Sequence, residues 1–310
     1  MPAQKRFSKT ILEAKATRLL SRLDERSQGA NARENRTRKL WLLSQQGFGA
    51  GAQFKALPTN PCFRAEPWVF SVMIADRLRL PIRDLEHRPC HERCPHPTGP
   101  HGDHMDACRL GAGSKARHDK VRDIVAEMHK TLLQDRDVTV EPLDLLPGAG
   151  DYRPADVAPS TYPGDAKPKA LDICVSSIAA ADHRHAALST RLDPLKALNA
   201  AESTKMNVDA SKVLELGLTP QQVPYEKVVL GFTTTGAWGK RAQKWRKDFI
   251  KAFNRIHEGA QPTMDDLDLD SNWSALDPMD YYTQRIAFSI AYHRAQRMVR
   301  RKWAATPRPA

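Results

Sequence analysis

Three cysteines and one histidine in a short segment have the residue types and spacing of a metal site. The pattern is Cys90-x3-Cys94-x9-His104-x3-Cys108, two short pairs separated by a loop rich in Gly and Pro. Structural zinc sites use three thiolates and one imidazole in tetrahedral geometry, and four protein ligands leave no position open for water. We therefore expect a structural zinc knuckle over residues 86–115. Three further histidines are alternative fourth ligands: His91, His96 and His101.

Two aspartates on short, strand-like segments form a second candidate site. The alternation in ALDICVS (170–176) places Asp172 on the face opposite Leu171 and Ile173. A carboxylate within a buried strand is costly unless it is paired or binds a metal. Asp156 begins the preceding strand, and two carboxylates at one sheet edge suit Mg or Mn, which can activate water at a scissile phosphate. The alternative is that Asp156 caps a turn and Asp172 pairs with a surface arginine.

Basic side chains on two expected helices are candidates for contact with an acidic partner. The helix expected over 117–134 carries Arg117, His118 and Arg122, and His118 is either catalytic or an ordinary hydrogen-bonded histidine. The helix expected over 239–257 carries a basic row that includes Lys240, Arg241, Lys244 and Lys247. Such rows suit phosphate contacts, which give affinity without sequence information. The alternative for the helix over 239–257 is a solvated charged face.

Composition narrows the class of protein. The 310 residues are 41% apolar, enough for one sizeable core, and carry 48 Lys+Arg against 36 Asp+Glu, a net charge of +12. This excess favours an acidic partner, most commonly nucleic acid. No apolar run reaches the length of a membrane span, the first twenty residues lack the apolar stretch of a signal peptide, and five cysteines argue against a disulfide framework. We therefore expect no membrane or secreted protein.

The elements that must position these residues follow from periodicity. Residues 1–85 are expected to form a helical region whose last helix ends before Pro81, and 86–115 the zinc knuckle. The remainder predicts a helix, three short strands (137–143, 155–158 and 170–176), a helix over 193–216, a strand over 227–235, and two basic helices over 239–257 and 279–303. This order predicts an α/β fold with helices on both faces of a small mixed sheet. We divide it into a core domain over 116–260 and a C-terminal basic helix over 261–310 packed on that core.

The order of several motifs resembles one family. In chain order they are GAGAQFKALPT, RLRLPI, the two Cys and His-Cys pairs, RHDKVRD, RPADV and LDICV. Together they resemble the region that follows the polymerase in reverse-transcriptase polyproteins of non-LTR retrotransposons, of the type with a restriction-enzyme-like endonuclease. The resemblance extends from about residue 45 to the C-terminal RIAFSIAYHRAQRMVRRKW. No paired-Asp polymerase motif occurs, so a fragment, a decayed copy and a stand-alone descendant all stay open.

The resemblance implies a PD-(D/E)xK restriction-endonuclease-like core in which Asp156 and Asp172 bind the catalytic Mg or Mn. The Pro-Asp of the family corresponds to Pro154-Ala155-Asp156, with one alanine interposed. Cys174 stands where a lysine is expected, and members that take this lysine from the following helix make Lys205 the expected residue. A second departure is the segment TTTG at 233–236, where an acidic residue is expected before the glycine.

The resulting expectation is a metal-dependent DNA endonuclease that nicks DNA, with catalytic residues Asp156, Asp172, Lys205 and His118. DNA is the expected partner, the RNA of the element is an additional candidate, and nuclear localisation follows from the resemblance and the basic composition. One alternative is a catalytically degenerate, zinc-stabilised nucleic-acid-binding protein. Another is a zinc-ordered interaction protein whose basic surface is incidental. The oligomeric state stays open.

Overall fold

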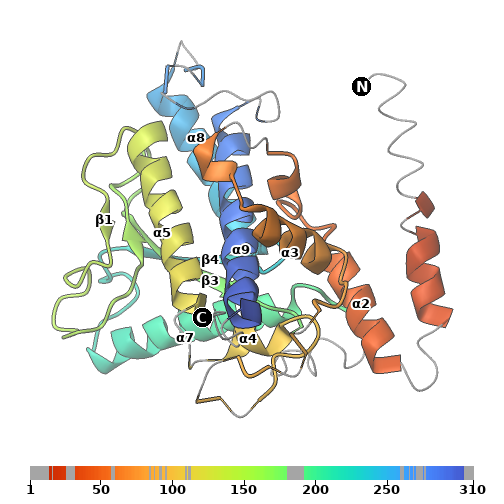
Figure 1. The fold of residues 1–310 in the computed structure, drawn as a ribbon. Coiled ribbons are helices and arrows are strands. Elements are labelled where there is room, and N and C mark those ends of the chain that lie inside the picture. Colours follow the sequence, from red (N-terminus) through yellow and green to blue (C-terminus); the bar gives the residue numbers. More distant parts are fainter. Residues whose placement is uncertain are drawn as a thin grey trace, which may run out of the picture.

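Helices surround one small sheet in the computed structural model of the chain (Figure 1). The structure describes residues 14–15, 17–25, 32–56, 60–83, 85–86, 88–90, 93–94, 96–108, 110, 113–179, 192–258, 262–264, 266–267, 269, 275 and 277–303. In chain order the elements are α2 (Ala32–Ser44), η1 (Ala52–Phe54), η2 (Pro61–Phe63), α3 (Pro67–Arg77), α4 (Asp103–Ala107), α5 (Gly113–Leu132), β1 (Thr139–Val140), β2 (Val157–Ala158), β3 (Lys169–Ser176), α7 (Lys196–Glu215), β4 (Glu226–Thr233), α8 (Lys240–Ile256) and α9 (Pro278–Trp303).

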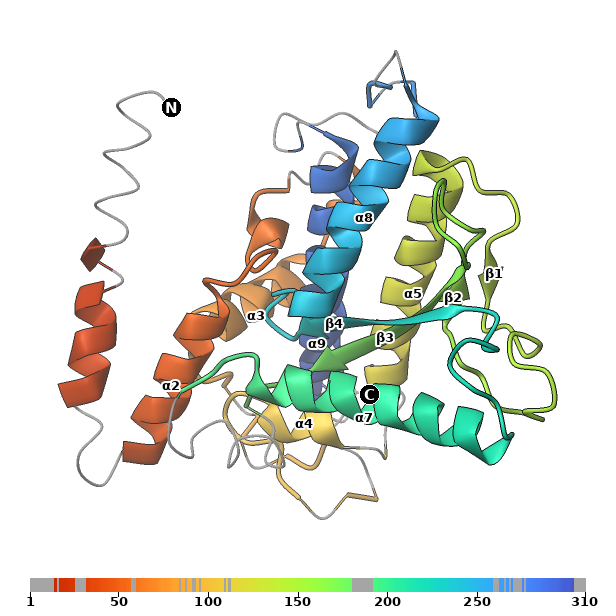
Figure 2. The ribbon, with the colours of Figure 1, turned by 180° about the vertical axis from the view of Figure 1, so that it is seen from behind.

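The sheet has the strand order β1-β2-β3-β4 and mixes both pairing directions (Figure 2). β1, β2 and β3 pair antiparallel, with Val157 opposite Leu171. β3 and β4 pair in parallel over their whole length, from Lys169–Glu226 to Ser176–Thr233. A parallel pair needs a long crossover, and α7 supplies it between the two strands.

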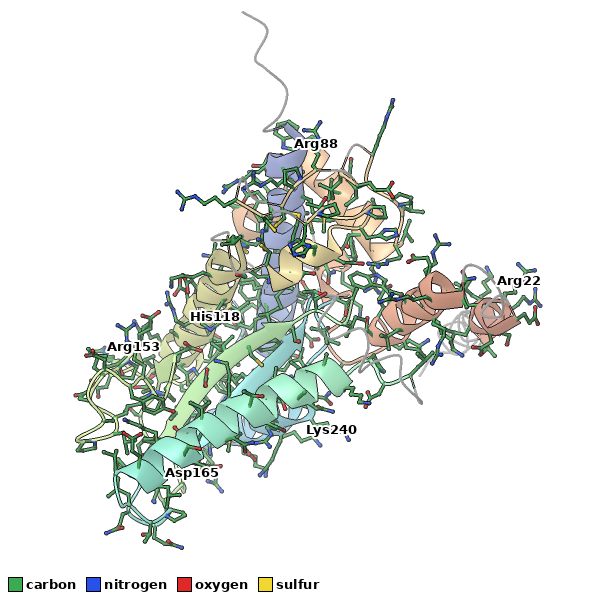
Figure 3. The ribbon with its side chains drawn as sticks, turned by 90° about the horizontal axis from the view of Figure 1, so that it is seen from below. Arg22, Arg88, His118, Arg153, Asp165 and Lys240 are labelled. Atoms are coloured by element: carbon green, nitrogen blue, oxygen red, sulfur yellow. The ribbon has the colours of Figure 1, made fainter. Side chains whose placement is uncertain are left out.

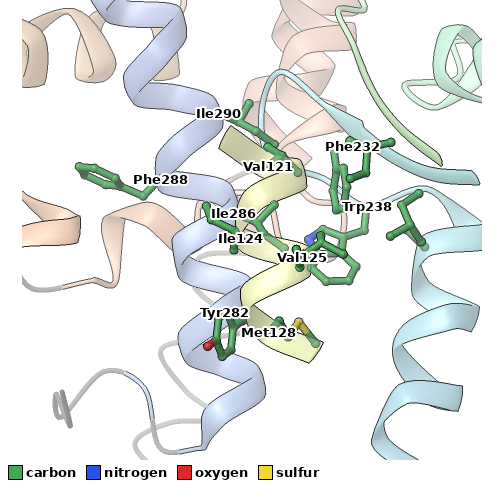
Figure 4. Packing of buried hydrophobic residues seen from close by; sticks show 14 of the residues in the cluster. Val121, Ile124, Val125, Met128, Phe232, Trp238, Tyr282, Ile286, Phe288 and Ile290 are labelled. Carbon is green, nitrogen blue, oxygen red and sulfur yellow. The ribbon is translucent and has the colours of Figure 1, made fainter. Parts of the chain in front are cut away.

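Helices cover both faces of this sheet. On one face α7 packs onto β3 and β4, where Leu198 meets Cys174 and Val229. On the other face the alternate residues of β3 and β4 join α5, α8 and α9 in the main apolar core, part of which Figure 4 shows: Val121, Ile124, Val125, Met128, Phe232, Trp238, Tyr282, Ile286 and Ile290. The two-residue alternation of the strands therefore separates two apolar layers.

The main core contains residues from widely separated parts of the described chain. Its buried members include Phe63 before α3, Met105 in α4, Val121 in α5 and Tyr282 in α9, so each of the four ranges into which the sequence was divided contributes to it. The long helix α9 packs against both α3 and α5. Trp41 on α2 is buried and donates its indole N–H to the carbonyl of Asp76, which attaches α2 to the end of α3.

The expected mixed α/β class with a small sheet flanked by helices is confirmed. The first two strands are shorter than expected, two residues each, because Glu141 adopts a positive φ of 51° before Pro142 and Pro159 follows β2. α3 ends at Arg77, before Pro81 as expected, and Arg79 turns the chain with φ 53°. None of the described helices combines the length and the apolar character that crossing a membrane requires.

Candidate functional site

The Cys/His segment brings its four expected ligands together. One ligand atom each from Cys90, Cys94, His104 and Cys108 lies within 4.8 Å of the other three. The Sγ atoms of Cys94 and Cys108 are 3.8 Å apart, and Cys94 Sγ is 3.1 Å from His104 Nε2. Thiolates about 2.3 Å from a central ion in a tetrahedron lie about 3.8 Å from each other. The cluster could therefore hold a metal such as zinc, as the sequence predicts.

Two local structures position these ligands. Cys90 and Cys94 lie in a loop closed by an isolated bridge between Pro89 and Pro97. α4 begins after Gly102, which has a φ of 66°, and the helix carries His104 and ends just before Cys108.

The alternative histidines are placed differently. His101 is buried, donates from Nδ1 to the Leu80 carbonyl (3.2 Å), and has Nε2 3.4 Å from Glu34. The ring of His96 lies 5.2 Å from that of His104, and His91 lies outside the described residues. His104 is therefore the histidine that completes the cluster.

Asp156 directly precedes β2 and continues its pairing with β3, since its backbone N–H donates to the Leu171 carbonyl (2.8 Å). Extending the antiparallel register by one residue places it beside Asp172. Its Oδ2 accepts the N–H of Ile173 (2.6 Å) and a hydrogen bond from His118 Nε2 on α5 (3.0 Å). Burial acts to raise the pKa of Asp156, but these hydrogen bonds and the charges of His118 and Lys205 outweigh it and lower the pKa to about 2. Burial acts to lower the pKa of His118, and Asp156 reverses this and raises it.

Asp172 binds a lysine with each carboxylate oxygen. Lys205 from α7 donates to Oδ1, and Lys227 from β4 donates to Oδ2 at 2.8 Å. The Asp172 side chain is 13% exposed and that of Lys205 35% exposed, so solvent reaches this pair. We call Asp156, Asp172, Lys205, Lys227 and His118 the strand charge cluster. The structure thus brings together all four residues expected to be catalytic, around β3 and between α5 and α7; Figure 3 shows His118 beside β3.

Three residues of this region were missed by the sequence reasoning. Lys227 has a side chain only 6% exposed, although a lysine at the start of a strand usually reads as a surface residue. Glu202 is 2% exposed and packs against Gly231 and Gly239; burial raises its pKa to about 7, with Arg241 3.6 Å away. Asp209 lies two turns further along α7. For Glu202 and Asp209 the signal in the sequence was their helical spacing relative to Lys205. Residues 202, 205 and 209 lie on one face of a helix.

Cys174 is buried on the same face of β3 as Asp172. Burial raises the pKa of its thiol to about 12, and the charges of Lys205, Glu202, Asp172 and Asp156 all act on it. Cys174 therefore lies next to the strand charge cluster, and it does not supply the positive charge of the lysine that was expected at this position. Within the described part of the chain, the Cys90 group is the one set of three or more His, Cys, Asp or Glu side chains arranged to share an ion.

The basic residues expected to bind nucleic acid fall into two groups. Arg117 was expected on the surface, but it is buried with 4% exposure. Its guanidinium donates to Asp106 of α4 at 2.9 Å. Arg122 is paired with Asp119, Asp123 and Glu141, which neutralise its charge. On α8, by contrast, Lys240, Arg241, Lys244 and Lys247 are exposed. Among the described residues, none of the three lysines has an ion-pair partner.

A pocket of about 210 Å³ lies between α8 and β4. Arg241, Lys244 and Trp245 of α8 form one wall, and Lys227 and Val228 of β4 form the other. Lys169, Glu226 and Asp248 also line the pocket, so its wall carries charges of both signs and includes the lysine that binds Asp172. No family model matches the sequence, and the search of curated proteins finds no match either, so the functional argument rests on this geometry.

Proposed function

We propose that the chain is a metal-dependent DNA endonuclease of the restriction-endonuclease-like type, related to the endonucleases of non-LTR retrotransposons. The observation that carries this proposal is the convergence of Asp156, Asp172, Lys205 and His118 on one edge of β3. These residues are far apart in the sequence and come from a loop, a strand and two helices. Their meeting at a partly exposed position supports a reactive site rather than four separate structural roles.

The donor chemistry of this position fits Mg²⁺ or Mn²⁺. Asp156 and Asp172 offer hard oxygen ligands, and Mg²⁺ is usually held by one or two carboxylates plus substrate phosphate oxygens and water. Both carboxylates now bind cations of the protein itself: His118 on one, Lys205 and Lys227 on the other. A bound ion would polarise the scissile phosphate and lower the pKa of a water molecule.

The side chains around the carboxylates have separate tasks in this proposal. Lys205 lies next to Asp172, where its ammonium can neutralise negative charge on the phosphate. His118 holds a proton against Asp156, which keeps that carboxylate ionised and oriented. The exposed lysines of α8 and the pocket beside β4 would guide the DNA backbone toward Asp172.

Nicking of supercoiled plasmid in the presence of Mn²⁺ tests the proposal. We expect wild type to produce open circles and Asp172→Asn to be slower by more than about a hundredfold, since even the partners of metal ligands are worth 10- to 100-fold in activity. Asp165→Asn is the matched control, because Asp165 pairs with Lys169 near the same sheet and does not contact the cluster. Equal rates for wild type and Asp172→Asn, or no nicking by either, would contradict the proposal.

A second candidate function is zinc-stabilised binding of nucleic acid without cleavage. It is favoured by one observation: both oxygens of Asp172 are already paired with lysines. The two functions differ in one result. If wild type does not nick but binds DNA through α8, the second function holds. Nuclear localisation is part of both proposals, and a cytoplasmic fluorescent fusion of the chain would contradict it.

A further inference from the structure

Lys227 lies between two aspartates rather than on one. Its Nζ is 2.8 Å from Asp172 Oδ2 and 3.9 Å from Asp209 Oδ1, and it also donates to the carbonyl of Pro154. The register pairs Lys227 with Ala170, two residues before Asp172, so these side chains share the face of the sheet that α7 covers. One ammonium therefore contacts β3, α7 and the segment that leads to Asp156.

Asp209 is a buried carboxylate held in a fixed orientation next to Lys227. Its side chain is 9% exposed, and Oδ1 accepts the hydroxyls of Tyr152 (2.9 Å) and Tyr225 (3.0 Å). These hydroxyls hold the carboxylate in one orientation. The distance of 3.9 Å to Lys227 Nζ is about 1 Å longer than a direct charge-assisted hydrogen bond. A small movement of the lysine side chain is enough to close this pair.

Charge explains why such a movement is needed. Asp172 carries one negative charge and binds two ammonium groups, Lys205 and Lys227. A divalent cation placed on Asp172 next to both would be repelled strongly at these distances. The Lys227 side chain is 6% exposed, and Asp209 offers it a second anion within the protein.

We propose that Lys227 is an internal counter-ion, which pairs with Asp172 when no divalent ion is bound and shifts to Asp209 when one binds. The inference rests on the proposed metal-dependent function and goes beyond it, because it assigns Lys227 and Asp209 the control of metal affinity. Lys227 is then a positioning residue. It occupies the second carboxylate oxygen of Asp172 when no divalent ion is bound, and Asp209 determines how easily the lysine leaves.

The chain contains a matched control for Lys227. Lys169 lies near the start of the neighbouring strand, is 5% exposed, and pairs with Asp165 and Glu226 at 2.9 Å each. It is thus a buried, ion-paired lysine of the same sheet whose partners are separate from Asp172. Its replacement tests the general effect of losing such a lysine.

Mn²⁺ titrations of the full, zinc-loaded chain test the inference, with binding to Asp172→Asn subtracted as background. We expect Lys227→Met to bind Mn²⁺ about tenfold more tightly, because a positive charge next to the ion is removed, and Asp209→Asn to bind it about tenfold more weakly. Lys169→Met should equal wild type. In the Lys227→Met background, Asp209→Asn should have no further effect, since the lysine that it receives is gone.

A purely structural role predicts the opposite pattern. If Lys227→Met and Asp209→Asn both weaken Mn²⁺ binding, if Lys169→Met matches Lys227→Met, or if the double variant is additive, the counter-ion inference is wrong. If the Mn²⁺ affinities of the variants change as expected but wild type does not nick DNA, the counter-ion inference holds and the proposed nuclease function is contradicted. Absence of Mn²⁺ binding in every variant overturns both.

Discussion

Two groups of charged residues meet at the start of α5 and differ in kind. Arg117 belongs to the first, the α4 charge network, which comprises Asp76, Arg79, Asp103, Asp106, Arg117 and Arg294. The next residue, His118, belongs to the strand charge cluster. In the network Arg294 and Asp106 are each 2% exposed, whereas in the strand charge cluster His118 is 27% and Lys205 35% exposed.

The two groups also use different cations. The α4 charge network uses arginines, whose planar guanidinium groups stay charged and bind carboxylates with two parallel hydrogen bonds, as Arg79 does with Asp103. The strand charge cluster uses lysines and a histidine, which are mobile point charges or change protonation near neutral pH. Arginine pairs with two parallel hydrogen bonds fix structure, while a lysine, which binds through a point charge on a flexible stem, can exchange carboxylate partners. The network thereby holds the start of α5, from which His118 reaches Asp156.

Loss of the metal ion from the Cys90, Cys94, His104 and Cys108 cluster is expected to lower stability most, because this cluster adjoins the α4 charge network. α4 carries His104 together with Asp103 and Asp106, so one of the four ligands shares a short helix with the network. We expect wild type to contain about one equivalent of zinc and Cys94→Ser less than half. Apparent zinc binding in small domains is worth about 10–16 kcal/mol, comparable to the total stability of a typical protein, so the segment should lose its order.

Metal analysis and chemical unfolding, with and without a chelator, check this prediction. Cys62→Ser is the matched control, because Cys62 is a half-buried cysteine outside the cluster. Equal zinc contents for wild type and Cys94→Ser, or an unfolding curve that does not respond to zinc removal, would refute the assignment.

Arg294→Ala breaks the α4 charge network directly. Arg294 binds both Asp76 and Asp106, and its loss leaves two carboxylates buried with fewer partners. Breaking a buried ion pair in this way costs about 3–5 kcal/mol. Arg300→Ala on the exposed side of α9 should stay within about 0.5 kcal/mol of wild type. Urea unfolding measures both, and similar losses for the two variants would show that the network is not the cause.

A buried histidine without a charged partner sharpens the comparison. His129 is fully buried, donates to the Val125 carbonyl (2.8 Å) and accepts the hydroxyl of Tyr162 (2.7 Å). Burial lowers its pKa to about 4, against about 6.5 in the unfolded chain. Because the folded pKa is the lower one, the folded state favours neutral His129. Its contribution to stability is complete above pH 6.5 and is lost as the pH falls toward 4.

Between pH 7 and 5 this linkage amounts to about 2 kcal/mol of unfolding free energy. We expect wild type to lose that much more stability over the interval than His129→Gln, even though the variant starts lower. His118 has a raised pKa and acts in the opposite direction, but it is present in both proteins and cancels in the comparison. Parallel pH profiles for the two proteins would contradict the prediction.

The sequence was sufficient where a pattern is local. The spacing of Cys90, Cys94, His104 and Cys108 predicted the metal cluster, and strand alternation identified Asp172 as a polar residue in a buried strand. Local patterns do not show which distant side chain will cover a residue. Arg117 was assigned to nucleic acid because its partners could not be foreseen: Asp106 lies on a separate helix, and Asp106 is also bound by Arg294 from the other end of the chain.

Lys227 was missed for a related reason. Its environment depends on the parallel pairing of β3 with β4 and on the helix between them, neither of which is encoded next to it. Lys205, on the same helix as Asp209, was found because the resemblance suggested a position for it, not because the residues around it did. Charged residues at a tertiary junction are therefore the part of the site that sequence periodicity specifies least.

Replacing a cation that has no ion-pair partner among the described residues should have the smallest effect on stability. Its main effect should be on DNA binding. Lys244 is exposed, lines the pocket beside β4, and has no ion-pair partner among the described residues. Lys244→Ala should leave the unfolding free energy within about 0.5 kcal/mol of wild type. It should weaken binding to duplex DNA and reduce the slope of log K against log salt by about 0.9, the loss of one phosphate contact.

Arg122→Ala is the matched comparison, because Arg122 carries the same charge but is neutralised by three carboxylates. It should leave the salt slope unchanged, since a paired guanidinium releases no counter-ion from DNA unless it first leaves its carboxylates. Fluorescence anisotropy at several salt concentrations measures both variants. A reduced slope for Arg122→Ala but not for Lys244→Ala would place the DNA on α5 instead of α8.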